Sequence, residues 1–178
     1  MLADDFAAEA VGFGAGLVVF PHGITVDRDG NVWIVDGNDN APRPARGAAP
    51  APNLNADIAE GWGAYNIGND TDLMHIIKSA SVACGFHAGD ANTMHRLCMM
   101  AKDLKVSVGA HPGFNDLWGF GRRRIQMKPS DLEYMIAYQI GALQAIASYA
   151  GLKVTHLKAH GALNNMAAID REYARAIG

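Results

Sequence analysis

After residue 52 the chain alternates short apolar runs with longer amphipathic segments. Apolar runs of strand length cover residues 53–58, 81–84, 106–110 and 154–159. Between and after them, helical spacing of apolar positions covers about 71–79, 90–104 and 130–150, and helical spacing resumes from Asp170. Four strand-then-helix units in series predict parallel strands joined by right-handed crossovers. We therefore expect an α/β fold, either an open sheet or part of a (β/α) barrel, with functional side chains at the carboxyl ends of the strands.

Several predicted helix ends carry residues that are typical of caps. Asp90 is placed to cap the helix that follows it. Ser130 and Glu133 form a capping box at the start of the longest helix. Gly151 is expected just after the end of that helix, where the backbone turns left-handed.

Residues 1–52 follow a different pattern. Alternating apolar positions within residues 17–36 predict two short strands joined by a turn at 27–31. These residues resemble part of one blade of an NHL-type β-propeller, but a lone blade cannot bury its own face, so we infer no propeller function. The Pro/Ala-rich composition that follows predicts an extended linker. The expected division is an arm with a β-hairpin (1–40), a linker (41–52) and a partial (β/α) domain (53–178).

The composition excludes some classes of protein. Of the 178 residues, 49% are hydrophobic and 19% charged, which is an ordinary globular balance. A net charge of -3 gives no reason to expect nucleic acid or an anionic membrane as a partner. Two cysteines without a CxxC spacing fit a reducing compartment, and the longest apolar run, 11–20, is too short to span a bilayer. With acidic residues at its start instead of a secretory signal, the chain is expected to be cytoplasmic.

Polar side chains follow each of the four predicted strands. In strand order they are Asn55, Asp57 and Glu60; His87 and Asp90; His111, Arg122 and Arg123; and Lys158 and His160. A single His or Asp at a strand end is typical of a cap or a solvated loop residue. Four such groups at equivalent places are not, because the carboxyl ends of parallel strands meet at one edge. The repetition therefore predicts a site at this edge.

Carboxylates and imidazoles on one rim allow two kinds of chemistry. They can bind a divalent metal that polarises a carbonyl, and the expected ligands are then Asp57, His87 and His111. Alternatively, Asp57 or a histidine can move protons without a metal. The long spacings between the histidines do not decide between the two. The arginines after the third strand can bind a carboxylate or phosphate, or lie at a solvated surface, and both interpretations stay open.

These motifs together resemble the LamB/YcsF family of 5-oxoprolinase subunits. The matching segments are LNADIAEGWGAYNIGND (54–70), SVACGFHAGD (81–90), GAHPGFNDLWGFGRR (109–123), YQIGALQAIA (138–147) and LKAHGALNNMAA (157–168). They cover residues 53–178 and correspond to the first half of a family member. The chain departs from the family pattern where an acid, a glycine, a proline and a tyrosine are common; the residues here are Asn53, Ala59, Ala159 and Asn164.

The resemblance implies a partial parallel (β/α) barrel of the polysaccharide-deacetylase type and, through it, a link to carbohydrate metabolism. It also implies ATP-dependent opening of 5-oxoproline to glutamate, together with two partner subunits. The candidate catalytic residues are then Asp57, Glu60, His87, His111 and His160, with Asp57 as the base toward water. The candidate substrate-binding residues are Asn55, Asp90, Lys158, Arg122 and Arg123.

Two other functions fit the same residues. One is a metal-dependent, deacetylase-like amide hydrolase that uses no ATP. The other is a binding or assembly role without catalysis. The chain has no GxxxxGK[ST] motif, so ATP would bind by another mode or on a partner. A half barrel would expose strand edges and apolar helix faces, which makes homo-oligomerisation a further expectation.

Overall fold

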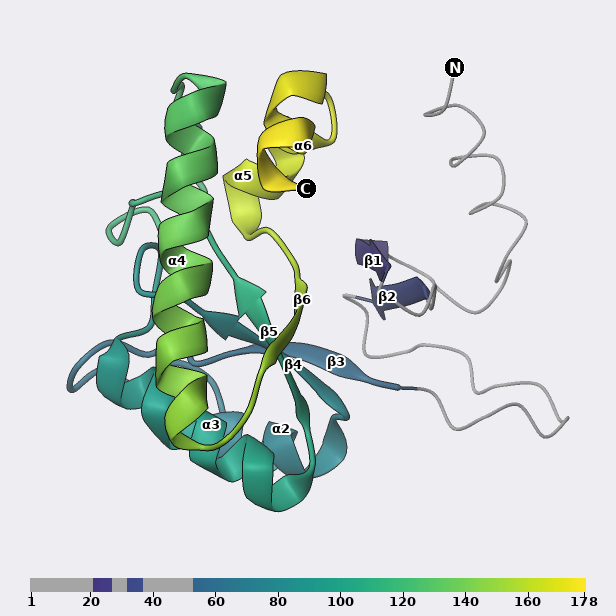
Figure 1. Ribbon diagram of the computed structural model, residues 1–178, viewed down its shortest axis with the longest axis vertical. Helices are drawn as coiled ribbons and strands as arrows, with labels where there is room; N and C mark the ends of the chain where they lie inside the picture. The colour runs from purple at the N-terminus through teal and green to yellow at the C-terminus, as the bar shows by residue number, and fades with distance from the viewer. Residues whose placement is uncertain (1–20, 27–31, 37–52) are drawn as a thin grey trace, which may run out of the picture. The chain divides into compact units, whose positions relative to one another are not determined.

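Figure 1 shows the computed structural model of the chain, which describes residues 21–26, 32–36 and 53–178. The chain divides into two units, Met1–Pro52 and Asn53–Gly178. In the first unit, β1 (Pro21–Val26) pairs antiparallel with β2 (Val32–Asp36), which are the two strands that alternation predicts there. The turn and the linker predicted in this unit lie outside the described residues.

The second unit is built on a parallel sheet in which spatial order follows sequence order, β3-β4-β5-β6. The strands are β3 (Asn55–Ile58), β4 (Ser79–Ala83), β5 (Ser107–His111) and β6 (Val154–Leu157). The predicted α/β fold with four parallel strands is therefore confirmed, with strand ends shifted by one or two residues. In the described part of the chain β3 and β6 each pair with a single neighbour, so this sheet is open.

Five helices follow these strands. They are α2 (Asp70–Ile76), α3 (Ala91–Leu104), α4 (Pro129–Tyr149), α5 (Gly161–Ala167) and α6 (Arg171–Ile177). Asp90 and Asp170 cap α3 and α6 by accepting hydrogen bonds from backbone N–H groups, as expected for both positions. Gly151 follows the end of α4 with a φ of 72°, the left-handed conformation predicted for it.

Three expectations about the helices were wrong. The capping box does not form, because α4 already begins at Pro129, whose fixed φ suits the first helical position, and no side chain caps the helix. α2 ends at Ile76, since β4 starts as early as Ser79. α5 was not predicted, because the segment after His160 has only seven helical residues and no capping side chain.

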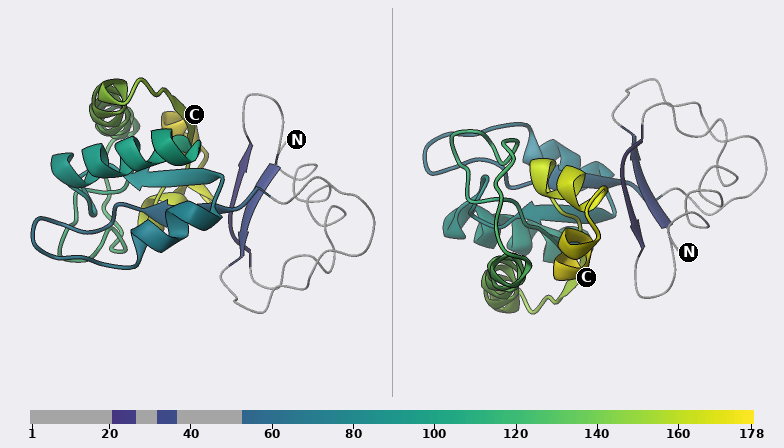
Figure 2. Two further views of the ribbon diagram at one scale, coloured as in Figure 1. Left: turned by 90° about the horizontal axis from the view of Figure 1, so that it is seen from below. Right: turned by 90° about the horizontal axis from the view of Figure 1, so that it is seen from above.

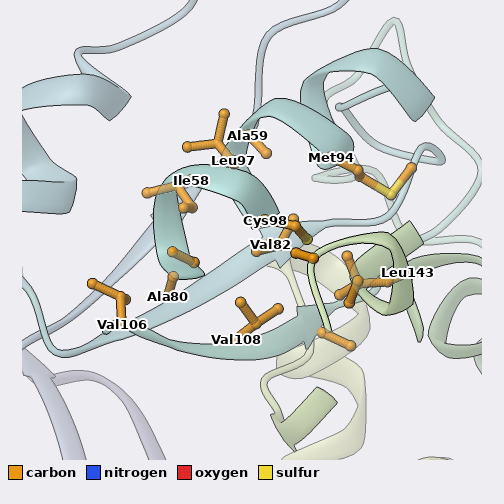
Figure 3. Packing of buried hydrophobic residues seen from close by; sticks show 14 of the residues in the cluster. Ile58, Ala59, Ala80, Val82, Met94, Leu97, Cys98, Val106, Val108 and Leu143 are labelled. Atoms are coloured by element: carbon orange, nitrogen blue, oxygen red, sulfur yellow. The ribbon is translucent and has the colours of Figure 1, made fainter. Parts of the chain in front are cut away.

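One face of the sheet is apolar and carries the helices. Alternate strand residues point to this face, among them Val82 of β4 and Val108 of β5 (Figure 3). Leu97 of α3 and Leu143 of α4 pack on them, and both leucines are fully buried. Figure 2 shows α3 and α4 next to one another over this face. A second cluster, built around Phe114, joins the N-terminal end of α4 to α5 and α6.

The other face of the sheet is polar and concave. Asn55 of β3 and His156 of β6 point to this face, and their side-chain nitrogens are 3.4 Å apart. In a flat sheet these strands would be separated by three strand spacings, about 14 Å. Ser79 of β4 also reaches His156, with 3.0 Å between Oγ and Nε2. At Gly109 of β5, a Cβ atom would overlap the His156 ring, so glycine lets this ring lie across the strand. The sheet therefore curls around its polar face.

Replacing Leu143 by alanine tests the apolar face. We expect a loss of about 2–5 kcal/mol in the free energy of unfolding, because a fully buried leucine leaves a cavity. Urea denaturation measures this loss. Ile76→Ala is the matched control, since Ile76 is 61% exposed and its truncation should change stability by no more than about 0.5 kcal/mol. Equal losses in the two variants would contradict the described packing.

Candidate active site

The carboxyl ends of the strands bring six of the ten predicted site residues together. They are Asp57, Glu60, His87, His111, Lys158 and His160. The first and last strands of the sheet meet here, because Lys158 Nζ donates to both carboxylate oxygens of Asp57 at 2.8 and 2.7 Å. This ion pair spans the concave face that the curl of the sheet creates.

Beside the ion pair, one carboxylate oxygen faces three imidazoles. Glu60 Oε1 lies 3.2 Å from His87 Nε2, 3.5 Å from His160 Nδ1 and 3.8 Å from His111 Nε2. The histidines are between 0% and 5% exposed, so water does not surround their rings. The His87 and His160 rings stack with their centroids 3.7 Å apart. The four donor atoms lie within 4.8 Å of one another, which is close enough for them to hold a metal ion.

This group differs from the metal ligands predicted from the sequence. His87 and His111 belong to it, but Asp57 does not, and Glu60 and His160 take part instead. The reason is the lysine that follows β6: Lys158 occupies both carboxylate oxygens of Asp57. The sequence places all these residues on one rim, but it does not show which carboxylate pairs with the lysine.

Backbone carbonyls fix which nitrogen of two rings carries hydrogen. His111 Nδ1 lies 2.6 Å from the carbonyl oxygen of Lys158, and His160 Nε2 lies 2.7 Å from that of Phe120. A carbonyl oxygen can only accept, so both of these nitrogens donate. The other two nitrogens, His111 Nε2 and His160 Nδ1, then present lone pairs, and they are 3.0 Å apart.

Burial sets the charge of the site. It lowers the pKa of His87, His111 and His160 to about 4 each, so the three rings are neutral at pH 7. Burial also raises the pKa of Glu60 and outweighs the attraction of the nearby imidazoles. In Asp57 burial acts in the same direction, but His111 and Lys158 together overcome it and lower the pKa. Asp57 is therefore the carboxylate that stays ionised most readily.

Close backbone approach holds the buried rings in place. Gly113 follows β5, and a Cβ atom there would lie 2.6 Å from His87 Nδ1. Gly121 has a φ of 63°, and a Cβ atom there would lie 2.7 Å from His87 Cβ and 2.9 Å from His160 Cδ2. Side chains at these two positions would displace the histidines, so glycine is required at both.

Gln139 of α4 fixes the same loop from outside. Its amide accepts from the N–H of Gly113 and donates to the carbonyl of Gly113, both at 3.0 Å, and its side chain is fully buried. This residue was not among those predicted from the sequence. A polar residue on the apolar stripe of a long helix is the signal that could have found it.

The remaining predicted site residues lie outside the histidine cluster. Asp90 accepts hydrogen bonds from the backbone N–H groups of Gly63, Asn92 and Thr93, as a helix cap does. Asn55 is deeper in the concave face, where it bonds to Ser79 and Ser81.

The two arginines follow different patterns. Arg123 Nε donates to Asp116 Oδ1 at 2.9 Å, and this pair closes the loop after β5. Arg122 lies with its guanidinium carbon 5.7 Å from the centre of the Phe120 ring. Since the Phe120 carbonyl binds His160, Arg122 is adjacent to the cluster without joining it.

A model of the LamB/YcsF family matches residues 52–178. The chain belongs to the LamB/YcsF family. It is 55% identical over 126 residues to a 5-oxoprolinase subunit of Rhodopseudomonas palustris (strain BisB5), covering 70% of this chain and 50% of that protein. It is 56% identical over 126 residues to a 5-oxoprolinase subunit of Bradyrhizobium diazoefficiens, covering 70% and 49%. The chain thus spans about half the length of these curated relatives, whose names imply a complex of several subunits.

A solved LamB/YcsF-like structure agrees with the fold. The crystal structure of the lactam utilization protein from Thermus thermophilus superposes with a TM-score of 0.69 at 46% identity, covering 70% of this chain and 51% of that one. The family match begins at residue 52, so it lends no support to the propeller-like interpretation of residues 17–36. Among the described residues, no helix has both the length and the apolar character that crossing a membrane requires.

Gln139→Leu tests the support of the loop after β5. The change keeps the size of the side chain but leaves the N–H and C=O of Gly113 buried without partners, so we expect a loss of about 2–4 kcal/mol in the free energy of unfolding. Chemical denaturation measures it. Gln126→Leu is the control on an exposed glutamine and should leave stability within about 0.5 kcal/mol. Unchanged stability in Gln139→Leu would mean that the clamp does not hold the loop.

Proposed function

We propose that this chain forms part of a hydrolase that opens the cyclic amide of 5-oxo-L-proline to L-glutamate with ATP. The names of the relatives support this substrate, and the family match covers the whole site. The observation that carries the proposal is the Asp57–Lys158 pair beside three buried imidazoles. It places a charged carboxylate, a cation and neutral proton carriers at one edge of the sheet.

In this proposal Asp57 is the base that takes a proton from the attacking water. Its side chain is 32% exposed, whereas the histidines are buried, so water reaches Asp57 most easily. Its lowered pKa keeps it ionised at neutral pH. Lys158, 12% exposed, supplies positive charge where the carbonyl oxygen of the lactam becomes negative. We assign contact with the substrate carboxylate to Arg122, because Arg123 is engaged by Asp116.

ATP and the partner subunits belong to the same proposal. An amide is stabilised by resonance, so phosphorylation of its oxygen by ATP would lower the barrier to attack by water. The chain has no GxxxxGK[ST] motif, and we place the ATP site on a partner subunit or in another binding mode. We further propose that the curled sheet is part of a deacetylase-type (β/α) barrel and that the complex acts in the cytoplasm.

A metal-dependent amide hydrolase that needs no ATP is the second candidate. The cluster of Glu60 with three histidines favours it, because carboxylate and imidazole are ordinary ligands of a catalytic zinc ion. The two candidates differ in what they consume. The first releases glutamate only with ATP, and the second hydrolyses an amide without it.

Turnover of 5-oxoproline by Asp57→Asn tests the assignment of the base. The full chain would be assayed for glutamate release with ATP and with the partner subunits of a relative. We expect the variant to be slower by about 10²–10⁴-fold, because asparagine cannot accept the proton. Asp103→Asn, an exposed carboxylate on α3, should retain the wild-type rate.

The outcomes separate the alternatives. Full activity of Asp57→Asn would show that another residue is the base. Glutamate release without ATP would favour the second candidate. No release by the wild-type chain under either condition, with partners present, would contradict the proposed function.

A further inference from the structure

We propose that His111 Nε2, His160 Nδ1 and Glu60 Oε1 bind one divalent metal ion of zinc type, and that His87 orients Glu60 without binding the ion. This inference rests on the geometry of the cluster and does not depend on the proposed substrate. It differs from a general statement that four residues could hold a metal, because it assigns three of them as ligands and excludes the fourth.

Two lone pairs face one another inside the cluster. His111 and His160 each donate one ring hydrogen to a backbone carbonyl, so their remaining nitrogens can only accept. These two acceptors are 3.0 Å apart and buried, and two lone pairs at that distance repel one another. A cation that both nitrogens share removes the repulsion. The carboxylate oxygen of Glu60, next to both, supplies negative charge for that cation.

The triangle of donor atoms has the size of a zinc site. Its three atoms are separated by 3.0, 3.5 and 3.8 Å. A tetrahedral zinc site with bonds of about 2.0–2.1 Å has edges of about 3.3 Å, which lies within this range. Calcium prefers six to eight oxygen ligands at longer distances, so a set of two imidazoles and one carboxylate favours zinc or a similar transition metal.

Hydrogen bonding separates His87 from the other two histidines. A histidine that binds a metal almost always donates its second ring hydrogen to a carbonyl or carboxylate. His111 and His160 meet this condition. His87 does not, because its Nδ1 is buried without a hydrogen-bond partner. Its Nε2 lies 3.2 Å from Glu60 Oε1, where a hydrogen bond from the ring fixes the carboxylate oxygen toward the ion.

The three ligands leave a coordination position for water or substrate, which is typical of catalytic rather than structural zinc sites. Asp57 Oδ2 is 3.4 Å from His111 Nε2, so the Asp57–Lys158 pair adjoins the proposed site. An ion bound here would polarise a carbonyl that reaches the rim. The same carboxylate that we propose as a base is thus close enough to contact a ligand of the ion.

Metal binding by the full chain tests the inference without measuring activity. Chelator-treated protein would be titrated with zinc in a calorimeter, and with cobalt while its visible absorption is recorded. We expect one ion per chain and the strong absorption of tetrahedral cobalt. His111→Gln and His160→Gln should weaken zinc binding by at least about 100-fold, whereas His87→Gln should keep one tetrahedral ion and lose about 10–100-fold in affinity. His75→Gln and His95→Gln, both exposed, are the controls and should change nothing.

Nitrogen NMR of the wild-type protein keeps the test independent of variant folding. Zinc should shift the resonances of His111 Nε2 and His160 Nδ1 and leave His87 Nε2 bound to hydrogen. Absence of stoichiometric zinc binding would overturn the proposal. So would direct coordination of zinc by His87, or a His111 or His160 ring that carries two hydrogens at neutral pH with or without zinc.

Discussion

The alternation of side chains along four curled parallel strands is the constraint on which the rest of this structure depends. Every second residue faces the helices and is apolar, while the residues between them face the concave side and are polar. Because the sheet curls, the ends of β3 and β6 approach each other, although two strands lie between them. A flat sheet of the same strands would hold Asp57 and Lys158 too far apart to bond.

The strands supply the position of the site, and the loops supply its chemistry. Two imidazoles are held by backbone carbonyls, one from the residue after β6 and one from the long loop after β5. Two glycines let the loop backbone come close to the rings, and Gln139 holds the loop from α4. Burial keeps the rings neutral, so their free nitrogens are available as ligands or as proton acceptors. Scaffold and site are thus joined by hydrogen bonds to the main chain.

The sequence was sufficient to predict the strand order of the rim and six of its side chains, because period-two alternation and parallel strand ends determine both. It could not show that Lys158 pairs with Asp57 and leaves Glu60 to the histidines, since that choice depends on how strongly the sheet curls. Gln139 was missed because its partner is backbone, which carries no sequence signal. Ala59 stands where the family usually has glycine, and it adopts a φ of 62°, so the turn before Glu60 does need the conformation that glycine favours.

The family match places this concave rim in proteins named for the opening of a lactam, while the geometry of the rim adds a cation as the missing partner of two facing nitrogens. Anomalous diffraction at the zinc absorption edge, from crystals of the full chain grown with zinc, tests this account most directly. It predicts one peak about 2.0–2.2 Å from His111 Nε2, His160 Nδ1 and Glu60 Oε1. Peaks confined to exposed histidines, with none inside this triangle, would contradict it.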